Sequence, residues 1–343
     1  MKSKICALAL PSIVASALVL SGCSASSPSG AATPGGLTPV SFQLNWSAGG
    51  PNAGFAVALA DGLYKEAGLD VTLSEGTGSG PTVQLVANNK AQIAFADATT
   101  VSQLIAKGAN MKVISTIYQA TPNNVLSLKS TGIKSVADIK GHSVGVPQGA
   151  SQSSMLPLLL EANGLAESDF EMVNMPATSQ VPALLEKKVD VIIGGVDSSA
   201  VQLEQQGADF DEYTWADNGV TTVAQSVFAN EGFLEQNPEV VRKFVAASIK
   251  GWETARKDPA HAVEALKKVF PDVVEETAAG ELDGIIPLLC AGGAKHLGRA
   301  EPEQWTRTQD LLSKVGMLPE GQDPANYYTY DYLPPESELP SCS

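Results

Sequence analysis

Residues 83–96, VQLVANNKAQIAFA, have the pattern of an amphipathic helix that leads into a buried strand, and the pattern returns at residues 181–194, VPALLEKKVDVIIG. The two copies are offset by 98 residues, and each turn between helix and strand contains a lysine, at Lys90 and Lys188. Units of this kind build sheets that are covered by helices. The repetition predicts two similar α/β units in one chain.

The segment around the first copy continues the alternation of strands and helices. Apolar and polar residues alternate over 40–46, which predicts a strand, and a helix is expected over 53–66. The next expected elements are a strand at 70–75, a glycine-rich turn at 76–80, a helix at 81–90 that starts on Pro81, and a strand at 92–96. This order predicts a parallel sheet covered by helices.

The last third of the chain has helical periodicity. Asn237-Pro238 and Asp258-Pro259 each have the form of an N-cap followed by proline, and a third helix is expected over 301–315. Trp252 and Trp305 fall on the apolar faces of these helices, so we expect both to be core residues.

The composition excludes several classes of partner. Asp and Glu number 37 against 22 Lys and Arg, a formal net charge of −15, which argues against nucleic acid. The three histidines, His142, His261 and His296, are far apart in the sequence and argue against a histidine-based metal cluster. We therefore expect neither a metal nor another cofactor.

The N-terminus has the features of an export signal. Lys2 and Lys4 precede an apolar stretch, 5–20, that is too short and too interrupted for a stable membrane span. It ends in LSGC (20–23), which resembles the bacterial lipobox and implies cleavage before Cys23 and lipid on its sulfur. Residues 1–22 would be the signal peptide, and the Ser-, Gly- and Pro-rich residues 23–38 a flexible tether on the extracytoplasmic face of the cell membrane. The alternative is an ordinary secretory signal with an incidental cysteine.

Cys290 and Cys342 are the two cysteines that remain after cleavage and lipidation. In an oxidising compartment we predict a disulfide between them, which would close a loop of about 50 residues and add about 4 kcal/mol of stability. The alternative is a buried Cys290 and a free thiol at Cys342.

Four further segments, in order along the chain, carry a family resemblance. The first comprises LNW (44–46), AGFAVA (53–58) and GLYKEAGLDV (62–71), and the second is GIKSVADIKG (132–141), continued by VGVP (144–147). The others are NPEVVRKFVAASIKGW (237–252) and YTYDYLP (328–334). Together they resemble the thiamine-pyrimidine, nitrate, sulfonate and taurine group of ABC-importer substrate-binding proteins, over about residues 40–334.

The resemblance implies an α/β type II periplasmic-binding-protein fold, with two lobes joined by two crossover strands and a ligand cleft between them. We expect lobe 1 at 39–121 and 222–343, lobe 2 at 122–221, and the crossovers near 117–124 and 219–228. The expected partners are a small-molecule ligand and an ABC permease with its ATPase, because the chain has no P-loop motif of its own. We expect the protein to be a monomer.

Candidate ligand-binding residues lie where strands are expected to end, because ligands bind beyond the carboxyl ends of strands in open α/β sheets. Trp46 offers an aromatic face and Asn45 an amide, while Gln119 and Gln225 fall at the crossovers. Ser151 opens a helix whose free N–H groups suit a hydrogen-bond acceptor. The full set is Asn45, Trp46, Asn52, Glu75, Asp97, Thr99, Gln119, Gln148, Ser151, Gly195, Asp197 and Gln225.

Several of these residues have a structural alternative. Trp46 could be a core residue, because it shares a strand face with apolar neighbours. Thr99, Ser151 and Asp197 could simply cap helices.

The ligand class follows from charge and from departures within the motif. In pyrimidine-binding members an Asp precedes the Trp, and Pro-Asn and a His follow, whereas this chain has Asn45, Ala48-Gly49 and Asn52 at those positions. No arginine precedes Arg242, so an anion would depend on Ser, amide and Lys donors. We favour a neutral or cationic heteroaromatic nutrient such as a thiamine-precursor-like pyrimidine, with an alkanesulfonate, taurine or an aromatic acid as the alternative.

Two other functional classes, an enzyme and a ligand sensor, are alternatives to an importer component. Pyrimidine-synthase relatives consume an active-site histidine, and this chain has none before His142. No nucleophile elbow or zinc-protease motif is present either, so we predict that the protein is not an enzyme. A ligand sensor that acts without a permease is the third hypothesis, and neighbouring permease genes would argue against it.

Overall fold

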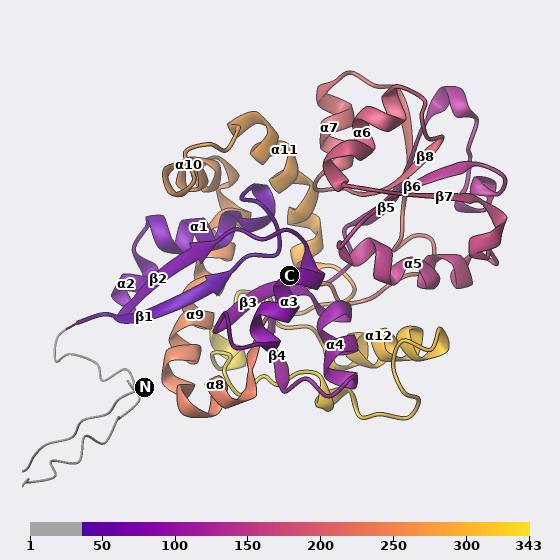
Figure 1. Ribbon diagram of the computed structural model, residues 1–343. Coiled ribbons are helices and arrows are strands. Elements are labelled where there is room, and N and C mark those ends of the chain that lie inside the picture. Colours follow the sequence, from indigo (N-terminus) through magenta and orange to yellow (C-terminus); the bar gives the residue numbers. More distant parts are fainter. Residues whose placement is uncertain (1–35) are drawn as a thin grey trace, which may run out of the picture. The chain divides into compact units, whose positions relative to one another are not determined.

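The computed structural model describes residues 36–343 (Figure 1). The expected signal peptide, the lipidation site Cys23 and most of the expected tether lie outside the described residues. Within residues 36–343, no helix combines the length and the apolar character that a membrane span requires.

Two five-stranded sheets organise the described part of the chain. Sheet A has the order β2-β1-β3-β10-β4, in which β1 pairs in parallel with β2 and β3 while β10 is antiparallel to β3 and β4. Its strands are β1 (Thr38–Gln43), β2 (Leu69–Ser74), β3 (Ile93–Asp97), β4 (Met111–Thr116) and β10 (Gln225–Asn230).

Sheet B repeats the arrangement with the order β7-β6-β8-β5-β9. Here β6 is parallel to β7 and β8, and β5 is antiparallel to β8 and β9. Its strands are β5 (Asn123–Leu128), β6 (Ser143–Pro147), β7 (Glu171–Met175), β8 (Val191–Gly195) and β9 (Phe210–Thr214). We call the parts built on the two sheets lobe A and lobe B.

The parallel arrangement predicted from residues 40–96 is confirmed for β1, β2 and β3, while each sheet also contains one antiparallel strand, β10 in sheet A and β5 in sheet B. The chain crosses from sheet A to sheet B between β4 and β5, and returns between β9 and β10. The first strand after each crossing is antiparallel to its neighbours: β5 in sheet B and β10 in sheet A. The pattern over 40–96 could indicate only the parallel β1–β2–β3 part.

The sequence repeat corresponds to a structural repeat. Helix α3 (Ser79–Ala87) leads into β3, and α6 (Ala177–Leu185) leads into β8, and both strands stand third in their sheets. All these bounds differ by the same 98 residues as the sequence copies. Asn89 and Lys187, at equivalent positions in the two turns, have φ of 53° and 57°, the left-handed backbone of a tight helix end. The two lobes are therefore similarly built.

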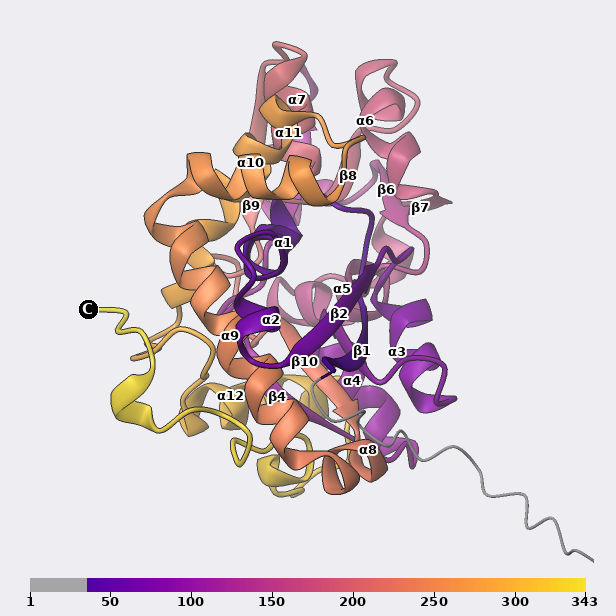
Figure 2. The same ribbon diagram turned by 90° about the vertical axis from the view of Figure 1, so that its left-hand side faces the viewer.

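The helices lie around the sheets (Figures 1 and 2). The expected helix over 53–66 is two helices, because Gly62 with φ of 80° breaks it, and α3 begins two residues before Pro81. The α-helices not yet given are α1 (Ala53–Ala60), α2 (Leu63–Glu66), α4 (Ala98–Ala106), α5 (Ser151–Ala162), α7 (Ser199–Gln205), α8 (Glu231–Gln236), α9 (Pro238–Lys257), α10 (Pro259–Val269), α11 (Glu275–Ile285) and α12 (Pro302–Lys314). Short 3-10 helices are η1 (Gly50–Asn52), η2 (Lys129–Thr131), η3 (Val136–Ile139), η4 (Glu167–Asp169), η5 (Ile286–Cys290), η6 (Pro324–Asn326) and η7 (Glu336–Glu338).

An aromatic cluster fills the core of lobe A. The ring of Phe55 lies 4.7 Å from Phe42, 4.9 Å from Phe95 and 5.5 Å from Trp252, in edge-to-face arrangements. A Cβ on Gly54 would lie 2.2 Å from the Trp252 ring, so only glycine lets α1 approach α9 this closely. Trp252 and Trp305 are both buried, as expected for core residues.

The C-terminal segment is tied back to lobe A. Cys290 and Cys342 form a disulfide with Cα atoms 5.3 Å apart, and Arg256 donates to the Ser341 carbonyl at 3.0 Å. The ring of Trp305 on α12 stacks on Tyr328 at 4.6 Å. These contacts hold residues 328–342 against α9 and α12.

Candidate functional site

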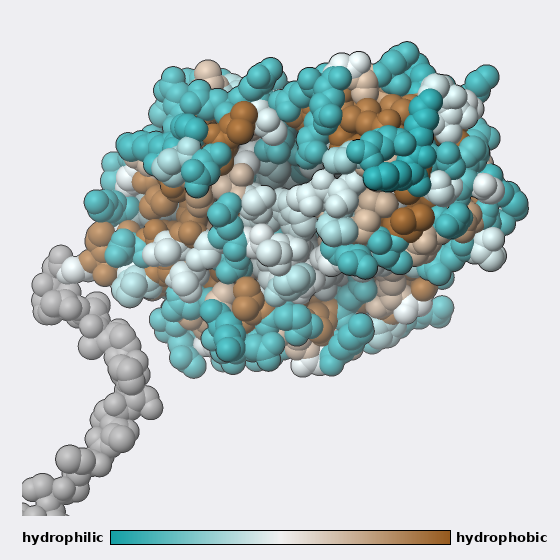
Figure 3. Space-filling view, turned by 45° about the horizontal axis from the view of Figure 1, so that its top comes forward, coloured by the Kyte–Doolittle hydropathy of each residue, from teal (hydrophilic) through white to brown (hydrophobic). Residues whose placement is uncertain are grey.

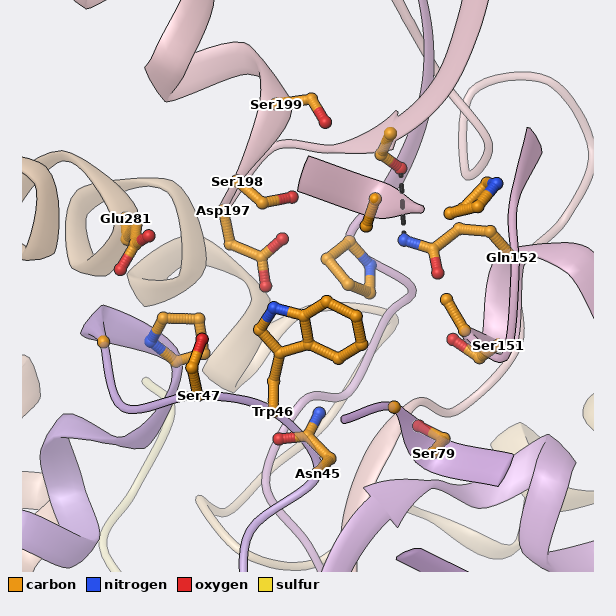
Figure 4. Close-up of a pocket in the computed structure, with 18 of the residues that line it drawn as sticks. Asn45, Trp46, Ser47, Ser79, Ser151, Gln152, Asp197, Ser198, Ser199 and Glu281 are labelled. Carbon is orange, nitrogen blue, oxygen red and sulfur yellow. Dashed lines mark hydrogen bonds between the residues drawn. The ribbon is translucent and has the colours of Figure 1, made fainter. Parts of the chain in front are cut away.

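A cavity of about 250 Å³ lies where the two lobes face each other. The surface is hollowed on the face shown in Figure 3, and Figure 4 shows the side chains that surround the cavity. Its lining comes from both lobes and comprises Asn45, Trp46, Ser47, Ala48, Gly49, Pro51, Gly78, Ser79, Pro122, Pro147, Ala150, Ser151, Gln152, Ala177, Thr178, Gln180, Gly194, Asp197, Ser198, Ser199, Gln202, Gln225 and Glu281.

The sheets and their helices explain why the cavity is here. Chain segments that follow β1, β6 and β8 line it, so it lies at the carboxyl ends of parallel strands. Helices α3, α5, α6 and α7 begin at it, with Ser79, Ser151, Ala177 and Ser199 as their first residues. The N-terminal N–H groups of these helices make the adjoining parts of the cavity favourable for hydrogen-bond acceptors.

Trp46 is a lining residue rather than a core residue. Strand β1 ends at Gln43, and the Trp46 carbonyl accepts from the Gly76 amide at 3.0 Å, so the chain has left the sheet where the indole begins. Phe42 and Leu44 stay fully buried in the core, whereas the indole of Trp46 points into the cavity (Figure 4). The flat ring is thus available to a planar ligand.

Asn45 links the loop after β1 to the start of β10 at the cavity. Its Nδ2 donates to Oε1 of Gln225, the first residue of β10, at 3.3 Å. Its Oδ1 is buried without a hydrogen-bond partner within the described residues. A buried acceptor without a partner is costly, so this oxygen is suited to accept a hydrogen bond from a ligand.

Two carboxyl groups, one from each lobe, face the cavity. Asp197 follows β8 in lobe B, and Glu281 on α11 accepts from the Gly50 amide at 2.8 Å. Burial raises the pKa of Asp197 to about 6 and that of Glu281 to about 7, and the charge of Asp197 adds to the latter. Burial and these two carboxylates also raise the pKa of the Tyr118 hydroxyl, which donates to the Pro51 carbonyl at 3.1 Å.

The described part of the cavity lining is uncharged or acidic. No Lys, Arg or His occurs among the residues of 36–343 that line the cavity. Asp197 and Glu281 therefore give the cavity a negative character when they ionise, and a ligand that donates hydrogen bonds or carries positive charge is favoured there.

Asp97 and Thr99 are not cavity-lining residues. Asp97 caps α4, because its Oδ1 accepts from the Thr99 amide at 2.9 Å and from the Thr99 hydroxyl. Burial raises the pKa of Asp97 to about 6. Its own amide donates to the Ser79 hydroxyl at 3.1 Å, so Asp97 supports a lining residue from behind.

Five other candidates also lie off the cavity. Asn52 is fully buried in η1, and Gln119 is buried and donates to the Thr116 carbonyl at 3.0 Å. Glu75 is exposed and accepts from the Ala48 amide at 2.6 Å, which holds the loop after β1, and Gln148 is exposed after β6. Gly195 is off the cavity but leaves room for a residue that lines it, because a Cβ there would lie 2.5 Å from the Asp197 carboxylate.

The sequence reasoning therefore placed five candidates on the cavity, Asn45, Trp46, Ser151, Asp197 and Gln225, and missed others. Ser79 lies inside the glycine-rich turn at 76–80 and Gln152 follows Ser151 directly, so the same local signals indicate both residues. Glu281 carries no such local signal, because it lies in an ordinary amphipathic helix far along the chain from β1.

Residues 51–262 match the protein family described as "NMT1/THI5 like". The chain belongs to this family. It is 29% identical over 300 residues to the riboflavin-binding protein RibY of Chloroflexus aurantiacus, a match that covers 83% of this chain and 84% of RibY. It is 26% identical over 236 residues to the formylaminopyrimidine-binding protein of Halalkalibacterium halodurans, covering 67% of this chain and 70% of that protein.

The fold matches solved binding proteins. The periplasmic aliphatic sulphonate binding protein SsuA of Escherichia coli superposes with a TM-score of 0.68 at 16% identity, over 86% of this chain and 99% of SsuA. At that identity the likeness concerns the fold. The NMT1/THI5-like chain thus has the type II periplasmic-binding-protein fold, with two α/β lobes joined by two crossover segments.

Proposed function

We propose that this protein is an extracytoplasmic substrate-binding protein that captures a small amino-bearing heteroaromatic nutrient between its lobes and delivers it to an ABC permease. The favoured ligand class is a thiamine-precursor-like pyrimidine. Membership of the NMT1/THI5-like family supports the proposal, and so do relatives that are named for binding riboflavin and formylaminopyrimidine. Lipid on Cys23 would hold the protein at the membrane.

The observation that carries the proposal is the combination of Trp46, Asp197 and Glu281 in one cavity whose described lining contains no cation. An aromatic ring can stack on the indole, which is worth about 0.5–1.5 kcal/mol beyond burial. Amino and ring N–H groups donate to carboxylates in charge-assisted hydrogen bonds. A sulfonate or carboxylate would instead meet like charge.

The size of the cavity favours one ring over several. An apolar protein cavity of about 150 Å³ is enough to bind benzene. The 250 Å³ here therefore suits a single six-membered ring with a few substituents. A fused three-ring flavin would require the lobes to stand further apart than they do in this conformation.

A second candidate ligand class, an alkanesulfonate, taurine or an aromatic acid, is favoured by one observation. Helices α3, α5 and α6 all begin at the cavity, and helix N-termini bind anions. Taurine could use both features, since its amine suits Asp197 or Glu281 and its sulfonate suits the helix termini. The thermal-shift screen described below separates the pyrimidine class from the sulfonate and acid class.

We propose binding rather than catalysis. A synthase that consumes a histidine would need one at the ligand, and none lines the cavity in the described residues. We further propose that residues 39–121 with 222–343, and residues 122–221, move as two bodies about the crossovers, so that the permease recognises the closed form. The protein is proposed to act as a monomer.

A thermal-shift screen tests the proposal. The panel holds 4-amino-5-hydroxymethyl-2-methylpyrimidine, riboflavin, taurine, an alkanesulfonate, nitrate and benzoate. A ligand at about 100 times its dissociation constant stabilises the folded state by about 2.7 kcal/mol. The expected result is a shift with the pyrimidine that Trp46→Ala and Asp197→Asn each reduce, while Glu276→Gln, an exposed residue on the same helix as Glu281, leaves it intact. A shift with sulfonates or benzoate alone would refute the ligand class.

A further inference from the structure

Helix α11 of lobe A lies against α7 of lobe B beside the cavity, as both views of the ribbon show (Figures 1 and 2). The face of α11 that meets lobe B carries Gly280 and Gly284, four residues apart and therefore on one side of the helix. Glu281, which lines the cavity, stands directly after the first of these glycines.

The approach at this contact leaves no room for a Cβ unless a neighbouring atom moves. A Cβ on Gly284 would lie 2.6 Å from the Val196 carbonyl oxygen, and a Cβ on Gly280 would lie 2.8 Å from Cγ1 of Val201. Beside them, the Thr277 hydroxyl donates to Oε1 of Gln205 at 3.1 Å. One added methyl group would have to push away the Val201 side chain at Gly280, or the backbone of lobe B at Gly284.

A second close contact between the lobes lies at the other side of Trp46. A Cβ on Gly78, before α3, would lie 2.5 Å from the Gly149 carbonyl oxygen, which also accepts from the Gly80 amide at 3.4 Å. Glycines thus permit the lobes to meet at both sides of the cavity. Of these two contacts, the one at Gly78 includes a lining residue, whereas the α11 contact lies wholly outside the cavity lining.

The α11 contact lies next to both acidic groups in the chain. Val196, which Gly284 meets, immediately precedes Asp197, and Gly280 immediately precedes Glu281. Any separation of α11 from lobe B therefore moves the two carboxyl groups apart. A ligand that bridges them would lose one of its two partners.

We propose that Gly280 and Gly284 are positioning residues that set how far the lobes close, and thereby the affinity for ligand, without touching the ligand. This inference rests on the proposed function of the cavity. It predicts that affinity depends on the absence of side chains at two positions where no ligand atom reaches.

A disulfide-trapping experiment tests the contact without any ligand. A Cβ on Gly280 would lie 3.9 Å from Cβ of Val201, within the range of about 3.5–4.5 Å that disulfides require. In a Cys6→Ser, Cys23→Ser background, the pair Gly280→Cys with Val201→Cys is expected to form a second disulfide, detected by non-reducing peptide mapping. The matched control, Ala279→Cys with Val201→Cys, is expected to stay reduced, because Ala279 packs on the core of lobe A. Failure of the first pair to cross-link while Cys290–Cys342 is oxidised would overturn the proposal.

Affinity measurements test the consequence. The probes are 4-amino-5-hydroxymethyl-2-methylpyrimidine and taurine, titrated calorimetrically. Whichever of the two probes the wild type binds, we expect Gly280→Ala to bind it about tenfold more weakly, because an overpacked contact costs about that much in affinity. We expect the added Val201→Ala to restore wild-type affinity. Gly284→Ala should weaken binding similarly and should not respond to Val201→Ala, since its clash is with backbone.

The outcomes separate the two proposals. Wild-type affinity in Gly280→Ala, or no rescue by Val201→Ala, would overturn the positioning role while leaving the binding function intact. If the wild-type protein binds neither probe, the proposed ligand class fails, and the cross-link still decides whether the α11 contact forms.

Discussion

Replacing Glu281 by glutamine is expected to change how the stability of the ligand-free protein depends on pH. Burial is the main cause that raises the pKa of this carboxyl from 4.5 to about 7, and the charge of Asp197 adds to it. Glutamine keeps an oxygen that can accept from the Gly50 amide, as Glu281 does at 2.8 Å. The variant therefore removes the titration with little change to the contact.

The direction and size of the change in stability with pH follow from the difference in proton binding between the folded and unfolded states. Between pH 4.5 and 7 the folded state holds a proton that the unfolded state has released, so the native protein loses stability as pH rises through this window. A displacement from 4.5 to about 7 is worth about 3 kcal/mol, since one pH unit corresponds to about 1.4 kcal/mol. Most of this loss falls between pH 5 and pH 8.

Urea unfolding at pH 5 and pH 8 measures the effect. The wild-type free energy of unfolding should fall by about 2–3 kcal/mol more than that of Glu281→Gln over this interval. Glu276→Gln, an exposed position on the same helix, should retain the wild-type dependence. Parallel pH profiles for wild type and Glu281→Gln would refute the argument that Glu281 is held in a buried, acidic cavity.

Three further predictions follow from single residues. Trp46→Ala should weaken binding of an aromatic ligand about tenfold in calorimetry, because stacking is worth up to about 1.5 kcal/mol, while Trp46→Phe should keep most of the affinity; equal affinities would show that the indole does not stack. Cys342→Ser should lower the free energy of unfolding in urea by about 4 kcal/mol, because the disulfide closes a loop with a sequence separation of 52 residues, and an unchanged midpoint would show that the bond does not form. Lys187→Gly should raise the free energy of unfolding by about 1 kcal/mol, since its φ of 57° is strained for lysine, and Asn89→Gly should raise it less because asparagine tolerates this backbone; a loss of stability in Lys187→Gly would contradict the assigned turn.

Much of the fold could be predicted because its signals are local and repeated. The strands expected at 70–75 and 92–96 lie within one residue of β2 and β3, and the helix at 301–315 lies within one residue of α12. The repeat at an offset of 98 residues marked equivalent units of the two lobes. The break at Gly62 was missed because helical periodicity continues on both sides of it.

The antiparallel strands could not be inferred in the same way. Strand β10 pairs with β3 and β4, which lie more than a hundred residues earlier in the chain, and its direction depends on the crossover from sheet B. The alternation of apolar residues marks a strand but carries no information about its neighbours.

In the site, too, the residues that could be predicted are those with a local sequence signal. Asn45, Trp46 and Asp197 follow strand ends, and the rule for open α/β sheets finds such residues. That rule also selected Asp97, which caps α4 instead, because a strand end and a helix cap have the same local sequence. Glu281 reaches the cavity through the packing of α11 on η1, where it accepts from the Gly50 amide, and no local sequence pattern predicts this long-range contact.

We propose above that the cavity binds an amino-bearing ring on Trp46 through acidic groups from both lobes. Isothermal titration of 4-amino-5-hydroxymethyl-2-methylpyrimidine into wild type and into an Asp197→Asn, Glu281→Gln double variant tests it most directly. We expect saturable one-to-one binding by the wild type and a loss of at least about tenfold in the double variant, because charged hydrogen bonds are worth about 1.5–3 kcal/mol. Tighter binding of taurine or an alkanesulfonate than of the pyrimidine, with unchanged or improved affinity in the double variant, would contradict it.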